Sequence, residues 1–259
     1  MIKFCPLISG SSGNATFIAY KNTKILVDCG VSARQIKYLL GRIGESLQDI
    51  SAILITHEHS DHVKGAGVLS KTVPVYATEK TWQAMTRQQE HAMPALARVL
   101  AADEIMELND LTVQPFSIPH DAAGPVGYNL MGGSKKVTVA TDMGKISESV
   151  ATAIRGSDTI LLESNYDPGM LQNGRYPWFL KNRITSNLGH LSNEQAATLC
   201  CAFARSGTRR IILGHLSENN NLPDMAFGAV KDALCQIGAD QDIFLEVAQR
   251  YAPSTMHAV

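Results

Sequence analysis

Short runs of apolar residues alternate along the chain with segments in which apolar residues recur at helical spacing. The runs are four to eight residues long and are bounded by glycine or polar turn residues, which predicts β-strands. Strands mixed with amphipathic helices are typical of a layered α/β or α+β domain. The predicted strands span residues 15–20, 24–28, 52–56, 73–77, 111–118, 127–131, 137–141, 159–162 and 210–213.

Three segments carry clear helix signals. Apolar residues follow the helical period across residues 32–43. The sequence S-N-E-Q from Ser192 has the form of a capping box and predicts the first turn of a second helix. A third helix is predicted over residues 223–236, which end shortly before a glycine. Residues 79–100 are helical in pattern but less regular, and Pro94 predicts a break or kink there.

The chain has 259 residues, of which 45% are hydrophobic and 18% are charged. This length and composition exclude a disordered, collagen-like or coiled-coil protein, and they allow a sizeable core. Because no linker interrupts the pattern of strands and helices, we expect residues 1–259 to form a single domain.

The cysteines and the apolar runs bear on the compartment. The five cysteines contain no CxxC pair and are odd in number, which disfavours a disulfide framework and favours a reducing compartment. The apolar runs are shorter than the roughly 18 residues that a membrane-spanning helix needs. The first run is also too short for a signal peptide. We therefore expect a cytoplasmic protein with no membrane partner.

Positive and negative charges nearly balance along the chain. There are 23 basic and 24 acidic residues, which give a formal net charge of -1. A protein that holds nucleic acid through bulk charge should be far more basic. A phosphate-rich substrate must therefore be met by local positive charge, or by charge that the sequence does not contain.

The most informative segment is T-H-E-H-S-D-H at residues 56–62, which follows a predicted strand. It places three of the eight histidines of the chain within six residues. Crowded imidazoles repel one another when protonated, whereas neutral imidazoles are good metal ligands. On extended backbone His57 and His59 can point toward one ion, and Asp61 and His62 can face a second position. The segment therefore predicts a metal site.

Other residues with ligand chemistry also follow predicted strands. His120, Asp142 and His215 each come just after an apolar run. Taken singly, each of these histidines would be read as a loop residue. Because functional side chains gather at the carboxyl ends of strands in open α/β sheets, the three can converge, and the carboxylate can bridge two ions. Asp28 is either a turn residue before Gly30 or the carboxylate partner that a metal-bound imidazole usually needs.

Together these residues resemble the five motifs of the metallo-β-lactamase superfamily, in order and over nearly the whole chain. T-H-E-H-S-D-H is similar to the HxHxDH signature of that superfamily. The resemblance implies an α+β fold, a four-layered αββα sandwich, and two divalent metal ions per chain, either Zn or Mn. It also implies that one ion is held by His57, His59 and His120, the other by Asp61, His62 and His215, and that Asp142 bridges them.

Residues in the second half of the chain resemble the ribonuclease Z branch of this superfamily. In that branch a Glu follows an apolar strand, as Glu163 does here, and a Gly-His segment follows later, as His190 does. The resemblance implies that these two residues form a proton-donating pair near the leaving group. Histidine is the usual proton donor near neutral pH. The alternative is that His190 merely lies at the first turn of the helix after Ser192. The candidate catalytic residues are His190, Glu163 and Asp61.

Longer segments are similar to the WalJ/YycJ group of the superfamily, which is associated with 5′-to-3′ exonuclease activity on duplex DNA. One departure is Tyr166, where His is common in that group. The similar segments are S-G-S-S-G-N at 9–14, H-E-H-S-D-H-V-K-G at 57–65, E-S-N-Y-D at 163–167, Y-P-x-x-L-K-x-R-I at 176–184 and G-H-L-S-N-E at 189–194.

Two segments supply candidate substrate-binding residues. The first is a loop of small residues whose backbone N–H groups can cradle a phosphate, although a plain turn would have the same sequence. The second spans residues 168–193, which contain basic and aromatic residues and no acid. Such a mixture suits contacts to nucleic acid, and the alternative is a solvated loop with its aromatics packed beneath. The candidates are Ser11, Ser12 and Asn14 in the first segment and Arg175, Lys181 and Arg183 in the second, with Tyr176, Trp178 and Phe179 interleaved.

The sequence therefore predicts a dinuclear-metal-dependent phosphodiester hydrolase, a nuclease of the 5′-to-3′ DNA exonuclease type. We expect a metal-bridged hydroxide to attack phosphorus while His190 protonates the leaving oxygen. Nucleic acid, and DNA ends in particular, is the expected substrate, and a homodimer is compatible with the sequence. The alternatives are a phosphodiesterase acting on a cyclic ribose phosphate, a thioester or lactam hydrolase of the same fold, and a metal-binding scaffold without turnover.

Overall fold

The apolar runs that the sequence pattern marks as strands all contain strands in the computed structural model, which describes residues 1–89 and 96–259. The three clear helix predictions are also confirmed, including the reciprocal capping box at Ser192. The helical reading of residues 79–100 is wrong at its end, because residues 97–99 pair in parallel with a neighbouring strand and this long-range pairing overrides the local pattern. Pro94 lies outside the described residues.

The chain divides into two compact units. The first unit comprises residues 1–117, 122–135 and 249–259, and the second comprises residues 118–121 and 136–248. Because the first unit combines three separate segments, the division does not follow a linker in the sequence. That residues 1–259 form a single domain stays a prediction.

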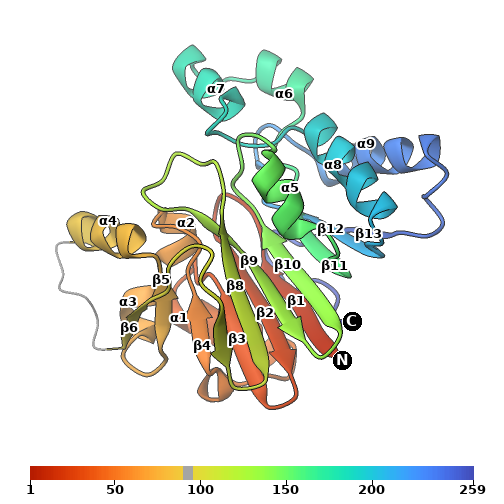
Figure 1. Cartoon of the computed structure of the whole chain (residues 1–259). Helices are drawn as coiled ribbons and strands as arrows, with labels where there is room; N and C mark the ends of the chain where they lie inside the picture. Colours follow the sequence, from red (N-terminus) through yellow and green to blue (C-terminus); the bar gives the residue numbers. More distant parts are fainter. Residues whose placement is uncertain (90–95) are drawn as a thin grey trace. The chain divides into compact units, whose positions relative to one another are not determined.

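The first unit contains a sheet with the strand order β14-β1-β2-β3-β4-β5-β6, of which β1 to β6 are labelled in Figure 1. Strands β1 to β3 pair antiparallel, whereas β3 to β6 pair in parallel. A further antiparallel run joins β7 to β8 and β8 to β9. The elements of this unit are β1 (Ile2–Ile8), β2 (Ala15–Tyr20), β3 (Thr23–Val27), α1 (Ala33–Arg42), the 3-10 helix η1 (Leu47–Asp49), β4 (Ala52–Leu54), α2 (Ser60–Val63), α3 (Ala66–Leu69), β5 (Val75–Ala77), α4 (Glu79–Gln89), β6 (Ala97–Val99), β7 (Met106–Leu108), β8 (Leu111–Ser117), β9 (Val126–Gly132) and β14 (His257–Ala258).

Helix α1 holds the parallel part of this sheet through its apolar face. Its buried residues Ile36, Leu39 and Leu40 share one core with Leu26 of β3 and Ile53 of β4. Each such side chain contributes about 1.5–3 kcal/mol when it is removed from water. The packing fixes β3 beside β4, so the residues that follow the two strands emerge at the same edge.

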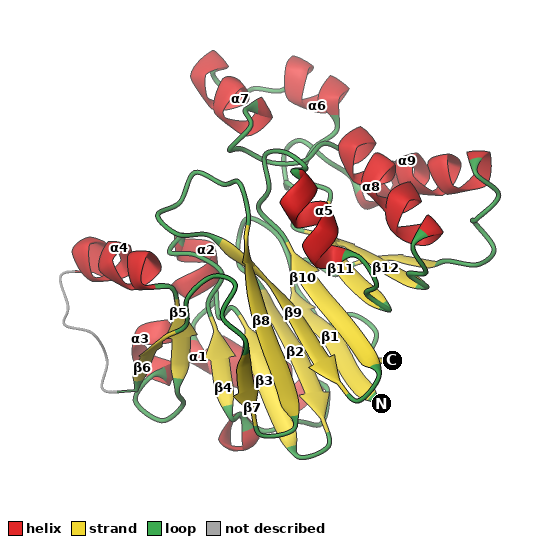
Figure 2. Ribbon diagram, in the orientation of Figure 1, coloured by secondary structure: helices red, strands yellow, loops and turns green. Residues whose placement is uncertain are grey.

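The second unit contains β10, β11, β12 and β13, which pair in parallel in this order. Helices α8 and α9 contact each other (Figure 2), and α9 also contacts β13. No helix in the described residues is long and apolar enough to cross a membrane. The elements of this unit are β10 (Lys135–Ala140), α5 (Glu148–Ile154), β11 (Thr159–Glu163), α6 (Pro168–Asn173), α7 (Trp178–Thr185), α8 (Asn193–Arg205), β12 (Arg210–Gly214), α9 (Pro223–Gln236) and β13 (Phe244–Val247).

Candidate active site

In the first unit, polar residues gather where β3 and β4 end. Asp28 follows β3, and Thr56 follows β4 after one further residue. The Asp28 carboxylate accepts hydrogen bonds from the Thr56 backbone N–H at 2.8 Å and from the Thr56 hydroxyl at 3.0 Å. Burial raises the pKa of Asp28, and the facing His62 opposes that effect. The carboxylate that the sequence marks is therefore part of a buried polar cluster.

His62 completes this cluster. Its Nδ1 lies 2.8 Å from the second oxygen of Asp28, and its side chain is fully buried. With the proton of this contact on Nδ1, the neutral imidazole has its lone pair on Nε2. The side chain of Asn14 lies 3.1 Å from that Nε2. The contact with Asp28 is of the kind that orients metal-bound histidines.

The short helix α2 places the second half of the T-H-E-H-S-D-H segment. His59 is the residue that precedes the helix, and Asp61 lies in its first turn. Asn14, in the loop before β2, fixes the position of this helix, because its backbone N–H donates a hydrogen bond to the Asp61 carbonyl at 2.8 Å. Gly30 allows this approach, since a Cβ there would lie 1.5 Å from the same carbonyl oxygen.

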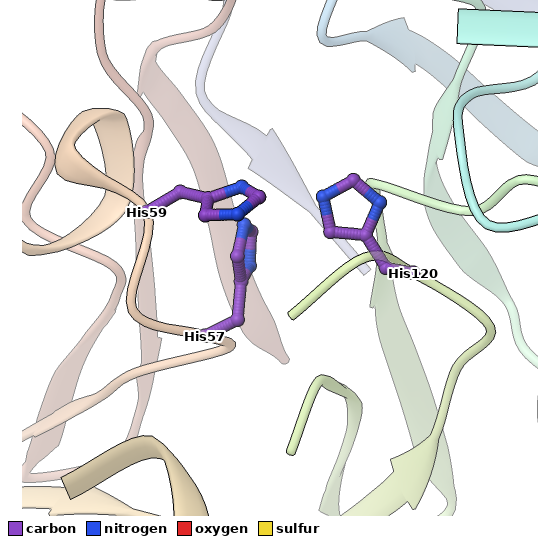
Figure 3. A group of neighbouring side chains, drawn as sticks. All are labelled: His57, His59 and His120. Carbon is purple, nitrogen blue, oxygen red and sulfur yellow. The ribbon is translucent and has the colours of Figure 1, made fainter. Parts of the chain in front are cut away.

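The imidazoles of His57 and His59 lie next to each other (Figure 3). Their ring centroids are 4.6 Å apart and their planes are nearly perpendicular, and the ring of His62 lies 4.1 Å from that of His57. His57 is completely buried, and its Nδ1 lies 3.0 Å from the hydroxyl of Thr56. Three neutral imidazoles at this spacing suit cation binding, whereas three protonated ones would repel.

In the second unit, polar residues gather in the same way at the ends of β10, β11 and β12. The pairing aligns Ala140 with Leu162 and Glu163 with Gly214, so the residues that follow these strands share one edge. Asp142 and His215, which come just after β10 and β12, have φ angles of +63° and +53°. Asp28 in the first unit has the same left-handed backbone, at +63°. This conformation is uncommon for residues other than glycine and is concentrated at functional sites.

Glu163, the last residue of β11, holds two imidazoles with one oxygen. Its Oε1 accepts a hydrogen bond from His190 Nδ1 at 2.8 Å and another from His215 Nδ1 at 2.9 Å. Its Oε2 accepts from the backbone N–H groups of Met143 and Leu191. Burial alone would raise the pKa of Glu163, but His190 and His215 lower it well below its usual range. The carboxylate therefore stays ionised, and its two oxygens accept four hydrogen bonds.

His120 takes part in a second set of polar contacts in this unit. Its Nδ1 lies 3.1 Å from the Gly189 carbonyl oxygen, directly before His190. Its Nε2 lies 3.3 Å from an oxygen of Asp121. The other Asp121 oxygen accepts a hydrogen bond from the Arg183 guanidinium, and Arg183 thereby ties α7 to the segment that carries His120. Burial is the main cause of a lowered pKa at His120, which keeps its imidazole neutral at neutral pH.

The predicted substrate-binding residues differ in their surroundings. Ser11 and Ser12 are exposed, whereas Asn14 is buried against Asp61 and His62. Arg175 is exposed. Lys181 and Arg183 form hydrogen bonds within the protein: Lys181 donates to the carbonyl of Gln172, and Arg183 donates to Asp121.

Three residues with direct contacts to the predicted site were not predicted from the sequence. Thr56 bridges Asp28 and His62, Asp121 contacts His120, and Asn165 donates to the carbonyl of His215 at 2.8 Å. Thr56 and Asp121 adjoin predicted ligands in the chain, so their position is a signal that could have found them. Asn165 lies within the E-S-N-Y-D segment that is similar to the WalJ/YycJ group, and that likeness is the signal that could have found it, although only the fold shows that it contacts His215.

The donor atoms present fit divalent cations. The Nδ1 atoms of His62 and His120 face oxygen acceptors, which leaves the Nε2 lone pair of each neutral imidazole as the ligand atom. Carboxylate and imidazole ligands together suit Zn²⁺ and Mn²⁺. In the second unit, ligand atoms within 4.8 Å of one another are offered by Asp142, Glu163, His190 and His215.

Comparisons with known proteins agree with this chemistry. Residues 23–216 match the Beta-lactamase superfamily domain. The chain is 37% identical to the exodeoxyribonuclease YycJ of Bacillus anthracis, over 92% of this chain and 90% of that protein. It is also 37% identical to the exodeoxyribonuclease WalJ of Streptococcus pneumoniae, over 93% of each.

A solved structure extends the likeness to the fold. The metallo-β-lactamase fold protein YhfI of Bacillus subtilis matches with a TM-score of 0.73 at 15% identity, over 98% of this chain and 100% of that one. The predicted fold class, the α+β metallo-β-lactamase sandwich, is therefore confirmed. The chain belongs to the metallo-β-lactamase superfamily and, within it, to the family of the exodeoxyribonucleases YycJ and WalJ.

Proposed function

We propose that this protein is a metal-dependent phosphodiester hydrolase that degrades DNA from the 5′ end. The relatives named exodeoxyribonucleases match it over more than nine-tenths of its length. The observation that carries the proposal is the shared Glu163 oxygen, which holds His190 beside the predicted metal ligand His215. A lactam or thioester hydrolase would have no role for this pair, and the small-molecule alternatives are not favoured by the relatives.

We further propose that the predicted ligands bind two divalent ions, Zn or Mn. Members of this superfamily typically bind divalent metals, and the chain offers the buried imidazoles and carboxylates that such ions need. When bound, the ions would supply Lewis acidity and lower the pKa of water. The proposed ligands are His57, His59 and His120 for one ion, Asp61, His62 and His215 for the other, and Asp142 as the bridge.

In this proposal His190 is the residue of the protein that donates a proton to the leaving group. Its side chain is 19% exposed, whereas its Glu163 partner is fully buried. The Nδ1–H is committed to Glu163, so Nε2 is the atom that gives a proton to the departing oxygen of DNA. Glu163 fixes the tautomer and stabilises the positive charge that His190 carries before transfer. Such a group accelerates the reaction by about 100- to 10,000-fold.

Substrate contacts are assigned to two segments of the chain. The exposed Ser11 and Ser12, with their backbone N–H groups, are proposed to bind phosphate. Arg175, Lys181 and Arg183 are proposed to attract the DNA backbone, because residues 168–193 contain no acid. Asn14 supports Asp61 and His62 through its hydrogen bonds. DNA ends as the substrate, the homodimer and the cytoplasmic location stay predictions.

The proposal is tested with single- and double-stranded DNA that carries a label at either the 5′ or the 3′ end. The metal-loaded protein should release mononucleotides from the 5′ end, and added salt should weaken binding steeply. His190→Ala should retain metal and lose about 100- to 10,000-fold in rate. Preferential cleavage of a cyclic phosphate, with no loss of DNA label, would replace this function with that of a small-molecule phosphodiesterase.

A further inference from the structure

Helix α7 has apolar residues that are packed and apolar residues that are largely exposed. Leu180 and Ile184 pack into a small core with Tyr166, Leu171 and Tyr176. Trp178 and Phe179, in the first turn of the same helix, are 77% and 72% exposed. These two values exceed those of every other aromatic side chain in the described part of the chain. The aromatic residues of this segment therefore divide into a packed residue, Tyr176, and an exposed pair.

The charge around this pair indicates what covers it. Residues 168–193 contain three Lys or Arg residues and no Asp or Glu, and one of the three, Arg183, is ion-paired with Asp121. Arg175 is exposed and lies three residues before Trp178. A second copy of the chain would present the same positive segment and be repelled by it. A partner that combines negative charge with flat apolar faces fits better, and single-stranded DNA has both, in its phosphates and its bases.

The other end of α7 is bonded to the proposed proton donor. The His190 backbone N–H donates to the carbonyl of Ile184 at 2.9 Å. Gly189 permits this close return of the chain, since a Cβ there would lie 2.1 Å from the same oxygen. Trp178 and Thr185 are the first and last residues of the helix, so they lie about 10 Å apart along its axis. That distance corresponds to about three stacked nucleotides.

We propose that Trp178 and Phe179 form a stacking platform for the unpaired bases of single-stranded DNA, with Arg175 contacting the phosphates beside them. This inference rests on the proposed function only in taking DNA as the substrate. Stacking of bases on aromatic side chains tolerates any sequence, because every base has a π-face. The platform would hold the strand a few nucleotides away from His190, so that binding does not depend on which base is being removed.

The native tryptophans provide a direct readout. The chain has two, of which Trp82 is 2% exposed and Trp178 is 77% exposed. Adding a phosphorothioate oligothymidylate, which resists hydrolysis, to the metal-loaded protein should quench the fluorescence of Trp178. A Trp82→Phe variant, in which Trp178 is the remaining tryptophan, should show the same quench as a larger fraction of its signal.

Affinity is measured by the anisotropy of the same oligonucleotide carrying a dye. Trp178→Ala and Phe179→Ala should each raise Kd by at least about fivefold, and the double variant should raise it further. Tyr38→Ala, which removes an aromatic ring that is 60% exposed on α1, is the matched control and should leave Kd unchanged. Because Trp178 and Phe179 are exposed, the variants should keep the circular dichroism of the parent.

The outcomes separate this inference from the proposed function. A Kd for Trp178→Ala/Phe179→Ala equal to that of Tyr38→Ala overturns the platform, even if the protein degrades DNA. Conversion of a dimer to a monomer by the double variant, with unchanged Kd, also overturns it and makes the pair a self-association surface. The double variant can bind the oligonucleotide more weakly than the parent while the parent itself hydrolyses no DNA. That result supports the platform and refutes the exonuclease proposal.

Discussion

The substitution Glu163→Gln tests how the polar cluster at the end of β11 is held. The carboxylate accepts hydrogen bonds from His190 and His215 at one oxygen and from two backbone N–H groups at the other. Glutamine has the same shape but presents an NH₂ group in place of one oxygen. In either orientation of the amide, this NH₂ group faces two N–H donors where an oxygen accepted from both. Each buried donor without an acceptor costs about 1–3 kcal/mol, so the free energy of unfolding should fall by roughly 2–6 kcal/mol.

The same substitution should affect metal binding and catalysis. His190 and His215 lose the acceptor that fixes their tautomers, so metal affinity should fall by about 10- to 100-fold. The rate of DNA hydrolysis with saturating metal should fall by about 100- to 10,000-fold.

The assays are urea unfolding of the metal-free protein, metal titration and hydrolysis of end-labelled DNA. Glu148→Gln, at an exposed position in the first turn of α5, is the matched control and should cost at most about 1 kcal/mol. The reasoning is refuted if Glu163→Gln matches this control in stability and in rate.

Three further predictions concern the surroundings of the site. Asp28→Asn should weaken metal binding by about 10- to 100-fold in a calorimetric titration, because the acceptor of His62 is changed; unchanged affinity would remove Asp28 from the site. Gly30→Ala should lower the melting temperature, because its Cβ would lie 1.5 Å from the Asp61 carbonyl oxygen, whereas Gly41→Ala, with open space inside α1, should raise it; equal effects would contradict this packing. Because the pKa of Glu163 is lowered in the folded protein, its stabilisation is complete above the unfolded pKa of about 4.3 and is lost as the pH falls toward the folded value. The difference in unfolding free energy between the wild type and Glu163→Gln should therefore stay constant from about pH 7 to 5 and shrink below about pH 4, and a difference that grows with acid would contradict the sign of the shift.

Local sequence signals were sufficient for the parts of the fold that depend on neighbouring residues. The Ser192 capping box, the period of α1 and the apolar runs before Asp28 and His57 each describe an interaction within a few residues. The strand at residues 97–99 could not be predicted in this way. It forms by pairing with β5, which lies about twenty residues earlier in the chain.

The candidate site shows the same limit. The histidines and acids were identifiable from their types and spacing, and the family resemblance, now confirmed, assigned their roles. How they are held was not identifiable. One Glu163 oxygen serves both His190 and His215, and Asp121 ties Arg183 to the segment of His120; these contacts join residues 27 to 62 positions apart.

The central claim is that this chain hydrolyses DNA with two divalent ions held by its histidines and acids. The most direct test adds Zn²⁺ or Mn²⁺ stepwise to the metal-free protein while the release of label from 5′-labelled DNA is followed. We predict that hydrolysis rises with bound metal and levels off at two equivalents per chain, and that His59→Ala lowers that plateau. Full hydrolysis before any metal is added, or none when both ions are bound, would contradict the account.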